Sequence, residues 1–424
     1  MKPVHGVNNG PVTFDFMRDA TSLFVRAGIP YSRLHDTEGD YGCGEFVDIP
    51  AVFKVFEADP ENPANYNFKM TDEYIKAIRK AGTKVIYRLG VTIENGPIKR
   101  HIYPPKDFHQ WARICEGVIR HYTEGWADGM QDGVEYFEIW NEPEFYNHMW
   151  LGTHEEFYKL FKDTIIYLKK KFPNVKIGGP ATGNNDKPFT EGFFKYLTEG
   201  ERAPLDFFSF HTYFRNPKKH IHDRFNEVRA LLDKSGYKDV PIFITEWNHV
   251  NGWDHMEEEY KRVSDHTGAA FVACALCELQ KTGYAIANYY DAQFGSSFNG
   301  LFKLARFEGH DDVQSLSPKP SFYAMEMFGD LYRLGTEAYS DAEEDVSVVA
   351  ATDGTTDSFL IGRYNQTAQN NVTAVIDVKN AHGTKADIIR YRADVNDVEI
   401  ETVDVIPNTI TLAPYSFARI VIHN

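Results

Sequence analysis

The chain has 424 residues, of which 42% are hydrophobic and 14% aromatic. That length exceeds one average domain and suits a barrel of roughly 250–330 residues followed by a smaller domain. With 45 basic and 61 acidic side chains, the formal net charge is −16. Such acidity argues against nucleic acid and anionic membrane surfaces as partners.

The sequence carries no sign of export or of a membrane anchor. Its first residues lack the apolar segment of a secretion signal, and no run approaches the length of a membrane span. Four cysteines (Cys43, Cys115, Cys274 and Cys277) are too few for a disulfide framework. The last two lie three residues apart in an apolar helical stretch, where we expect buried thiols rather than a metal site. We therefore expect a cytoplasmic protein.

Apolar strands alternate with amphipathic helices through the first three quarters of the chain. The expected strands are 4–8, 31–36, 83–89, 134–142, 175–180, 205–213, 241–246 and 284–291. The expected helices are 13–27, 71–81, 107–122, 154–172, 188–198, 222–235, 257–280 and 319–334. Residues 37–67 have little periodicity and predict a long loop of the functional kind. Eight strands alternating with helices predict an α/β fold of the (β/α)8 TIM barrel type, and no Gly-rich phosphate loop follows the first strand to favour a doubly wound sheet.

Beyond Gly335 the helical periodicity stops. Short alternating segments separated by turn residues follow, at 346–351, 358–363, 372–378, 386–391, 398–405 and 416–422. This pattern predicts an all-β sandwich of about ninety residues. We place the catalytic barrel at 1–334 and the accessory sandwich at 335–424, and the absence of a low-complexity linker predicts that the two pack together.

Two glutamates stand at the ends of predicted strands. The fourth strand closes on Asn141-Glu142-Pro143, where proline prevents further pairing. The seventh closes on Thr245-Glu246-Trp247-Asn248. A lone glutamate at a strand end is more often a solvated cap or part of a salt bridge. Two of them at the catalytic end of a barrel favour a glycosidase, whose reaction needs an acid and, in retaining enzymes, a carboxylate nucleophile.

The two motifs belong to a longer resemblance. The motifs that carry it are Phe137-Glu-Ile-Trp-Asn-Glu-Pro143, Gly178-Gly-Pro-Ala181, His211-Thr-Tyr213 and Ile244-Thr-Glu-Trp-Asn248. Segments 31–36, 157–175 and 319–324 extend the same resemblance. The chain resembles glycoside hydrolase clan A, and more closely family 39, which holds β-xylosidases, α-L-iduronidases and arabinose-releasing enzymes. The resemblance implies Glu142 as acid/base and Glu246 as nucleophile, with no cofactor and no metal.

The same resemblance implies roles for five neighbours. Asn141 would bind the sugar 2-hydroxyl, Arg33 and Tyr213 would hold and ionise the nucleophile, and His35 and His211 would line the sugar site. Independently, a guanidinium beside Glu246 would keep it charged. Glu142 needs a pKa raised by burial and by the charge of its partner.

Other side chains near the strand ends are weaker candidates. The sugar subsite could be framed by Trp140, His148, Trp150, Trp247 and Trp253, although core packing is an equal alternative for Trp140 and loop scaffolding is expected for Trp253. Asp291 ends the eighth strand and is a further candidate.

Two nearby glutamates call for structural roles. Glu138 is expected to form an ion pair inside the barrel with an arginine such as Arg88. Glu144 is expected to cap a loop, with sugar contact as the alternative.

Two stretches depart from the text of family 39. They are Asn8-Asn9-Gly10 at the end of the first strand and Tyr290-Asp-Ala at the end of the eighth. Both lie around the expected sugar site and leave open which sugar is bound.

The leading hypothesis is a retaining glycosidase that acts from the end of short plant-type oligosaccharides. A β-xylosidase is the first choice and an α-L-arabinofuranosidase the alternative. Other classes are a metal-dependent barrel enzyme using His35, His211 and Asp291, and a carbohydrate-binding barrel without catalysis. The substrate would be an oligosaccharide or glycoside, and a homo-oligomer would fit the habit of the family.

Overall fold

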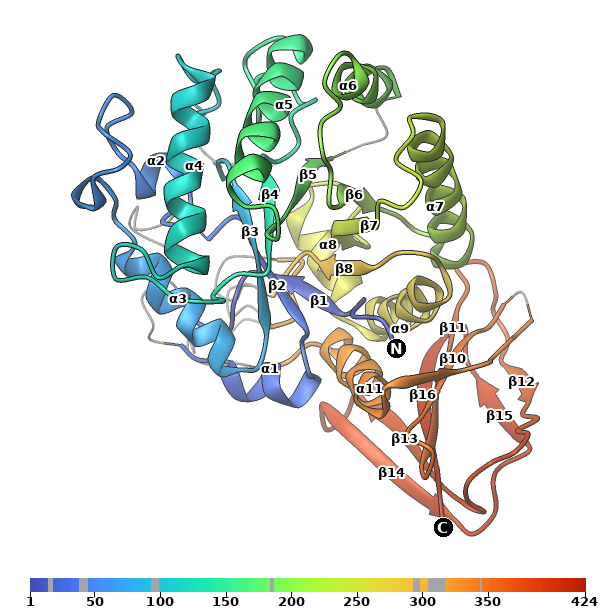
Figure 1. Cartoon of the computed structure of the whole chain (residues 1–424). Coiled ribbons are helices and arrows are strands. Elements are labelled where there is room, and N and C mark those ends of the chain that lie inside the picture. The colour runs from blue at the N-terminus through green and yellow to red at the C-terminus, as the bar shows by residue number, and fades with distance from the viewer. Residues whose placement is uncertain are drawn as a thin grey trace.

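A computed structural model describes residues 1–13, 18–37, 45–92, 99–183, 187–292, 298–303, 317–343 and 345–424. Its centre is a closed barrel in which each parallel strand bonds to the next and the eighth returns to the first (Figure 1). The strands are β1 (Gly6–Asn8), β2 (Tyr31–Leu34), β3 (Lys84–Leu89), β4 (Tyr136–Ile139), β5 (Lys176–Thr182), β6 (Phe208–Tyr213), β7 (Ile242–Asn248) and β8 (Ile286–Tyr289). The TIM barrel prediction is confirmed.

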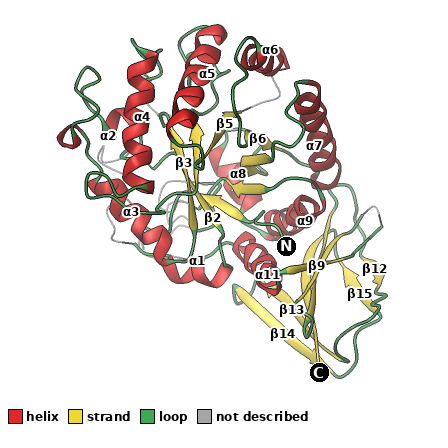
Figure 2. Cartoon of the chain, in the orientation of Figure 1, coloured by secondary structure: helices red, strands yellow, loops and turns green. Residues whose placement is uncertain are grey.

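Helices surround the barrel on its outer side (Figure 2). They are α1 (Thr21–Ala27), α2 (Ile49–Val52), the 3-10 helix η2 (Pro63–Asn65), α3 (Lys69–Lys80), α4 (Phe108–Thr123), α5 (His154–Lys171), α6 (Lys187–Thr198), α7 (Pro217–Lys234), α8 (Met256–Val263), α9 (His266–Lys281) and α11 (Pro320–Leu334). Among the described residues, no helix is long and apolar enough to cross a membrane.

Capping groups explain where the helices differ from the sequence pattern. The helix expected at 257–280 is two helices, because the Asp265 carboxylate accepts from the backbone N–H groups of Thr267 and Gly268 and starts a new one. The helix expected from 222 begins five residues earlier, because Asn216 caps it and Pro217 fits its first turn.

The loop expected at 37–67 contains α2 and η2, and its residues 38–44 fall outside the described ranges. Cys43 is among them. The other three cysteines are buried free thiols, which was the expectation for Cys274 and Cys277.

The C-terminal part is an antiparallel domain of two unequal sheets. Six strands run in the order β14-β13-β16-β11-β10-β9, and β12 pairs with β15. Their bounds are β9 (Thr336–Ala338), β10 (Ser347–Thr352), β11 (Asp357–Tyr364), β12 (Val372–Val375), β13 (Lys385–Arg392), β14 (Asp397–Val403), β15 (Thr409–Leu412) and β16 (Tyr415–His423). Apolar side chains of both sheets, such as Ile361, Ile420 and Leu412, share one core. The short strands β9 and β15 were not expected from the sequence.

This β-domain packs on the barrel through α9 and α11 (Figure 1). Leu360 and Phe417 belong to the same apolar core as the barrel helices. Polar contacts cross the same junction: Ser347 Oγ donates to Glu278 Oε1 at 2.6 Å, and Tyr364 Oη lies 2.6 Å from His249 Nε2. We propose the domain boundary at residues 334 and 335, between the end of α11 and the start of β9.

Because the two domains share a core, we predict that Leu360→Ala in β11 lowers the stability of the barrel. Truncating a fully buried leucine costs about 2–5 kcal/mol. All six tryptophans precede residue 335, so tryptophan fluorescence during urea unfolding reports on the barrel alone.

The matched control is Val375→Ala, since Val375 is 80% exposed in the same domain. An unfolding midpoint by tryptophan fluorescence that is equal in the two variants would contradict a shared core.

Candidate active site

The backbone at the end of β4 turns sharply, and this turn presents two adjacent side chains to the barrel mouth. Successive strand residues point to opposite faces. Left-handed φ angles of 71° at Trp140 and 45° at Glu142 break that alternation, so Asn141 and Glu142 both reach the site. The Glu142 N–H donates to the carbonyl of Ala181 at 2.8 Å. Left-handed geometry at non-glycine residues is strained and recurs at functional sites.

The carboxylate of Glu246, in β7, accepts hydrogen bonds from side chains of two other strands. Arg33 Nη1 donates to its Oε1 at 2.8 Å, and the Tyr213 hydroxyl donates to its Oε2 at 2.8 Å. Both oxygens are therefore fixed, and the side chain is only 6% exposed. The expectation that Arg33 and Tyr213 hold this carboxylate agrees with the geometry.

One histidine stands between the two carboxylates. His211 Nδ1 lies 2.7 Å from Glu142 Oε1 and 3.4 Å from Glu246 Oε2. One oxygen of each glutamate and this nitrogen all lie within 4.8 Å of one another. The site therefore brings together residues of β4, β6 and β7 that are far apart in the sequence.

That group is also the one set of three possible metal ligands among the described residues. It differs from the set His35, His211 and Asp291 that a metal-dependent barrel enzyme would have needed. Asp291 accepts instead from Asn9 Nδ2 at 3.2 Å. The hydrogen bond between His211 Nδ1 and Glu142 Oε1, and the 3.4 Å contact of the same nitrogen with Glu246 Oε2, already hold these three side chains together.

Burial separates Glu142 from an ordinary surface glutamate. It raises the pKa of Glu142 to about 7, although the charges of Arg33 and His148 act in the opposite direction. At neutral pH a large fraction of this carboxyl group holds its proton. The expectation of a raised pKa at Glu142 agrees with this environment, and burial is the main cause.

Burial also raises the pKa of Glu246, and repulsion from Glu142 adds to the rise. The charges of His211 and Arg33 and the hydrogen bond from Tyr213 lower it. Arg33 therefore offsets the effect of burial in part and favours the charged form of Glu246, which is the direction expected from the sequence.

Arg33 connects four parts of the site. Besides Glu246, it donates to Glu138 Oε2 at 2.6 Å, to Asn8 Oδ1 at 3.1 Å and to Asn141 Oδ1 at 2.7 Å. The guanidinium has no exposed surface. Because the Asn141 carbonyl accepts from Arg33, the amide is oriented with its NH2 available to a ligand hydroxyl.

Glu138 forms the expected ion pair with an arginine inside the barrel, but this arginine is Arg33 and not Arg88, the residue given as the example. Arg88 lies beside Glu138 in the sheet, yet its Nη2 reaches Asp48 Oδ1 at 2.5 Å. Its Nε donates to His35 Nδ1 at 3.2 Å.

The two histidines are neutral donors. Burial is the main cause that lowers the pKa of His35 well below its usual value, and it lowers that of His211 to about 4. Since His35 Nδ1 accepts from Arg88, its proton sits on Nε2, which lies 3.2 Å from Asp36 Oδ1 and 3.8 Å from Glu246 Oε1. His211 carries its proton on Nδ1, because that nitrogen faces two carboxylates.

Residues 46–385 match the family model described as glycosyl hydrolases family 39. The match covers most of the chain. The chain belongs to glycosyl hydrolase family 39.

Named relatives agree with this membership of family 39. A beta-xylosidase of Geobacillus stearothermophilus is 26% identical over 348 residues, which cover 73% of this chain and 66% of that protein. A beta-xylosidase of Caldicellulosiruptor saccharolyticus is 25% identical over 271 residues, which cover 59% of this chain and 50% of that protein. The matched parts thus span just under two thirds and one half of these relatives. A glucosidase from Croceicoccus marinus has the same fold, with a TM-score of 0.75, 22% identity and coverage of 100% of this chain and 96% of its own.

Within this family 39 barrel, the tryptophans named from the sequence divide into core and mouth. Trp140 and Trp150 are fully buried and pack edge to face, and Trp247 is fully buried between Phe214 and Tyr289. A sugar contact by these rings finds no support in the structure.

The remaining candidates lie nearer the surface or beside the mouth. Trp253 is 50% exposed and its ring touches those of Tyr213 and Tyr290, so it remains a candidate. His148 is exposed close to Glu142, whereas Glu144 is buried.

Sequence reasoning missed two supporting positions. Asn8 fixes Arg33 and donates to the carbonyl of Thr245 at 2.9 Å, directly before the nucleophile candidate. Gly183 leaves room for Glu142, since a Cβ there would lie 2.4 Å from Glu142 Oε1. A glycine just after β5 was the available signal for Gly183. Asn8 belongs to the stretch Asn8-Asn9-Gly10 already noted in the sequence, but that stretch gave no sign of its contact with Arg33.

We predict that Arg33→Met destabilises the fold by about 3–5 kcal/mol, because it leaves Glu138 and Glu246 buried without their cation. Arg26→Met is the control. Arg26 pairs with Glu326 but is 39% exposed, where an ion pair contributes about 0–1 kcal/mol. Urea unfolding gives the free energy of unfolding of both variants. A decrease of less than about 1 kcal/mol in Arg33→Met would show that the stability of the fold does not depend on Arg33.

Proposed function

We propose that this protein is a retaining glycoside hydrolase with Glu142 as acid/base and Glu246 as nucleophile. The observation that carries the proposal is that one oxygen of Glu142 lies within 4.8 Å of one oxygen of Glu246, while the two carboxylates have unlike surroundings. Retaining glycosidases hold these groups about 5–5.5 Å apart, whereas inverting enzymes hold them roughly 6.5–9.5 Å apart to admit a water. Family membership and the partner groups of each glutamate support the same roles.

In the first step Glu142 gives its proton to the glycosidic oxygen while Glu246 attacks the anomeric carbon from the opposite face. The bond from carbon to the leaving oxygen breaks as the bond to Glu246 forms. Tyr213 and Arg33 hold both oxygens of Glu246 in place. This leaves the carboxylate little freedom to rotate away from the attack direction.

In the second step Glu142, now ionised, takes a proton from water, and the water oxygen attacks the anomeric carbon. The bond to Glu246 breaks and the acid form of Glu142 returns. The His211 Nδ1–H can donate to either glutamate, because Nδ1 lies within 3.4 Å of an oxygen of each. It stabilises whichever carboxylate carries the charge. The NH2 of Asn141 binds the 2-hydroxyl, a contact that strengthens in the transition state.

The substrate is proposed to be the terminal unit of a short plant-type oligosaccharide, with a β-xyloside as the first choice. Two sequence relatives named beta-xylosidase support it. An α-L-arabinofuranoside is the alternative, because the departures after β1 and β8 lie beside the site. A panel of aryl xylosides, arabinofuranosides, arabinopyranosides, glucosides, galactosides and fucosides decides between them, and activity that survives a strong chelator would exclude a metal-dependent mechanism.

Two displacements leave the anomeric configuration unchanged. We therefore predict that proton NMR of the released sugar, taken before mutarotation, shows the anomer of the substrate. A 2-fluoro glycoside with a good leaving group should label Glu246, and Glu246→Gln should escape labelling while remaining folded. Release of the opposite anomer would overturn the retaining mechanism, and labelling of another residue would overturn the role of Glu246.

We predict that Glu142→Ala harms substrates with poor leaving groups far more than dinitrophenyl glycosides, whose leaving group needs little protonation. Protonated Glu142 is the form that donates the proton, and the pKa of Glu142 is about 7. The kcat/KM for substrates with poor leaving groups should therefore fall as pH rises through about 7. Glu155→Ala, an exposed change of the same kind on α5, is the control. Equal damage to both substrate types would remove Glu142 from the acid/base role.

A further inference from the structure

Four asparagines of the chain are followed by glycine, at residues 9–10, 95–96, 251–252 and 299–300. In such a pair the glycine nitrogen can attack the side-chain carbonyl of the asparagine, because glycine has no side chain to obstruct the approach and its backbone is permissive. The reaction needs an exposed asparagine side chain and a glycine N–H, neither of them held by hydrogen bonds. The pair at 95–96 lies outside the described residues, which leaves three pairs to compare.

Two of these three pairs are buried and hydrogen-bonded. Asn9 is fully buried, and its Nδ2 donates to Asp291 Oδ2 at 3.2 Å. The N–H of Gly10 donates to the Tyr74 hydroxyl at 2.6 Å. Asn299 is 1% exposed, and its Nδ2 donates to a backbone carbonyl at 2.8 Å. Neither side-chain amide can turn toward the following nitrogen without breaking a buried hydrogen bond, which is costly.

The third pair, Asn251 and Gly252, differs in both respects. It lies in an irregular segment between β7 and α8, where Asn251 is exposed. The Asn251 N–H donates to Glu259 Oε2 at 2.9 Å. Within the described ranges, neither the Asn251 side-chain amide nor the Gly252 N–H has a hydrogen-bond partner. A Cβ built on Gly252 would meet nothing within 4 Å, so the space around this backbone is open.

We propose that Asn251-Gly252 is a site of spontaneous deamidation. The amide nitrogen of Gly252 bonds to Cγ of Asn251, the bond from Cγ to the side-chain nitrogen breaks, and ammonia leaves with the proton of the Gly252 N–H. The product is a five-membered succinimide ring. Water then opens the ring at either of its two carbonyls, which gives aspartate or isoaspartate at position 251. Each conversion replaces a neutral amide by a carboxylate and needs no reagent except water.

The new carboxylate would lie beside groups that hold the segment after β7. Glu259, which accepts from the Asn251 N–H, is 8% exposed and pairs with Arg262. Arg262 Nη2 in turn donates to the carbonyl of His249, three residues after Glu246. A second carboxylate close to Glu259 repels it, and this repulsion weakens the contacts that orient the segment.

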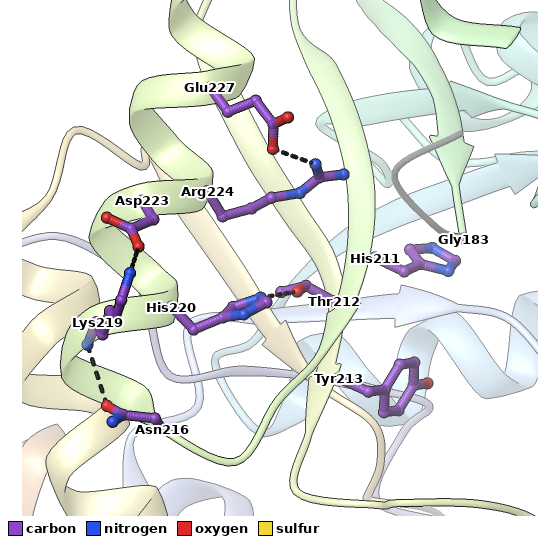
Figure 3. A pocket seen from close by; sticks show the side chains of 10 residues that line it. All are labelled: Gly183, His211, Thr212, Tyr213, Asn216, Lys219, His220, Asp223, Arg224 and Glu227. Atoms are coloured by element: carbon purple, nitrogen blue, oxygen red, sulfur yellow. Dashed lines mark hydrogen bonds and ion pairs between the residues drawn. The ribbon is translucent and has the colours of Figure 1, made fainter. Parts of the chain in front are cut away.

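Isoaspartate also lengthens the main chain by one carbon atom shortly before Trp253. The centre of the Trp253 ring lies 5.9 Å from that of Tyr213 and 6.1 Å from that of Tyr290. Tyr213 projects from β6 on the same side as His211 (Figure 3), and its hydroxyl donates to Glu246 Oε2 at 2.8 Å. A shift of Trp253 therefore reaches a donor that holds the nucleophile candidate. We expect deamidation to lower activity, and this consequence rests on the proposed function.

The experiment incubates the full chain in warm, mildly alkaline buffer and follows each asparagine by peptide mass spectrometry, which detects the replacement of NH2 by OH. A buried asparagine reacts only when its surroundings open, so conversion at Asn251 should exceed that at Asn9 and Asn299 at least about tenfold. Asn380 is the internal control, because it is exposed but followed by alanine, and it should stay unconverted.

Gly252→Ala is the matched variant. It should fold normally, because the added Cβ meets nothing within 4 Å, and it should lower conversion of Asn251 at least about tenfold, because the Cβ hinders the attack. During the same incubation, the kcat/KM of the wild type for the aryl glycoside that it cleaves fastest should fall in proportion to the converted fraction of Asn251. The kcat/KM of Gly252→Ala should stay constant.

Absence of conversion at Asn251, or equal conversion at Asn9 and Asn299, would overturn the modification site. Conversion of Asn251 at constant kcat/KM, or an equal loss of activity in Gly252→Ala, would overturn its effect on the active site. If fresh protein releases no dinitrophenolate from any glycoside, the proposed function fails, while the mass measurement still decides the modification.

Discussion

The buried guanidinium of Arg33 is the constraint on which barrel and site both depend. A cation without solvent contact is tolerated only when several well-placed acceptors surround it. The acceptors of Arg33 come from β1, from β4 and the turn after it, and from β7. These strands are far apart in the sequence, so the arginine is satisfied only when the barrel has closed in the correct register. The same closure aligns the Glu246 carboxylate and the Asn141 amide, which makes the geometry of the site a consequence of the geometry of the fold.

The two glutamates share a dry environment and differ in their donors. Glu246 accepts from the Arg33 guanidinium and the Tyr213 hydroxyl, whereas Glu142 has the neutral His211 beside it. Burial raises both pKa values, and only at Glu246 do a direct cation and a second donor oppose the rise. The proton that the pair holds therefore resides on Glu142. Burial, a neighbouring charge and hydrogen bonds thus give two residues of one type different tendencies to hold a proton.

The order of the strands and the two glutamates could be predicted from local signals. These are the hydrophobic periodicity, the proline after Glu142 and the place of each glutamate at the end of an apolar run. Which arginine pairs with Glu138 could not be predicted from the sequence. Arg33 and Arg88 both lie on neighbouring inner strands, and the choice between them follows from the stagger of the closed barrel and from Asp48, which holds Arg88. Trp150 and Trp247 illustrate a second limit: an aromatic residue near a strand end has the same signature whether its ring faces sugar or core.

The two departures from the family text are one structural feature. Asn9 follows β1 and Asp291 follows β8, and the closure of the barrel brings them together, where Asn9 Nδ2 donates to Asp291 Oδ2 at 3.2 Å. Both side chains are fully buried. A buried carboxylate requires a donor, and a buried amide requires an acceptor, so neither residue is replaced cheaply without the other. The pair follows β1 and β8, whereas Glu142 follows β4 and Glu246 lies in β7. Under the proposed function, sugar choice and bond cleavage would therefore rest on separate sets of side chains, and the first could change while the second is preserved.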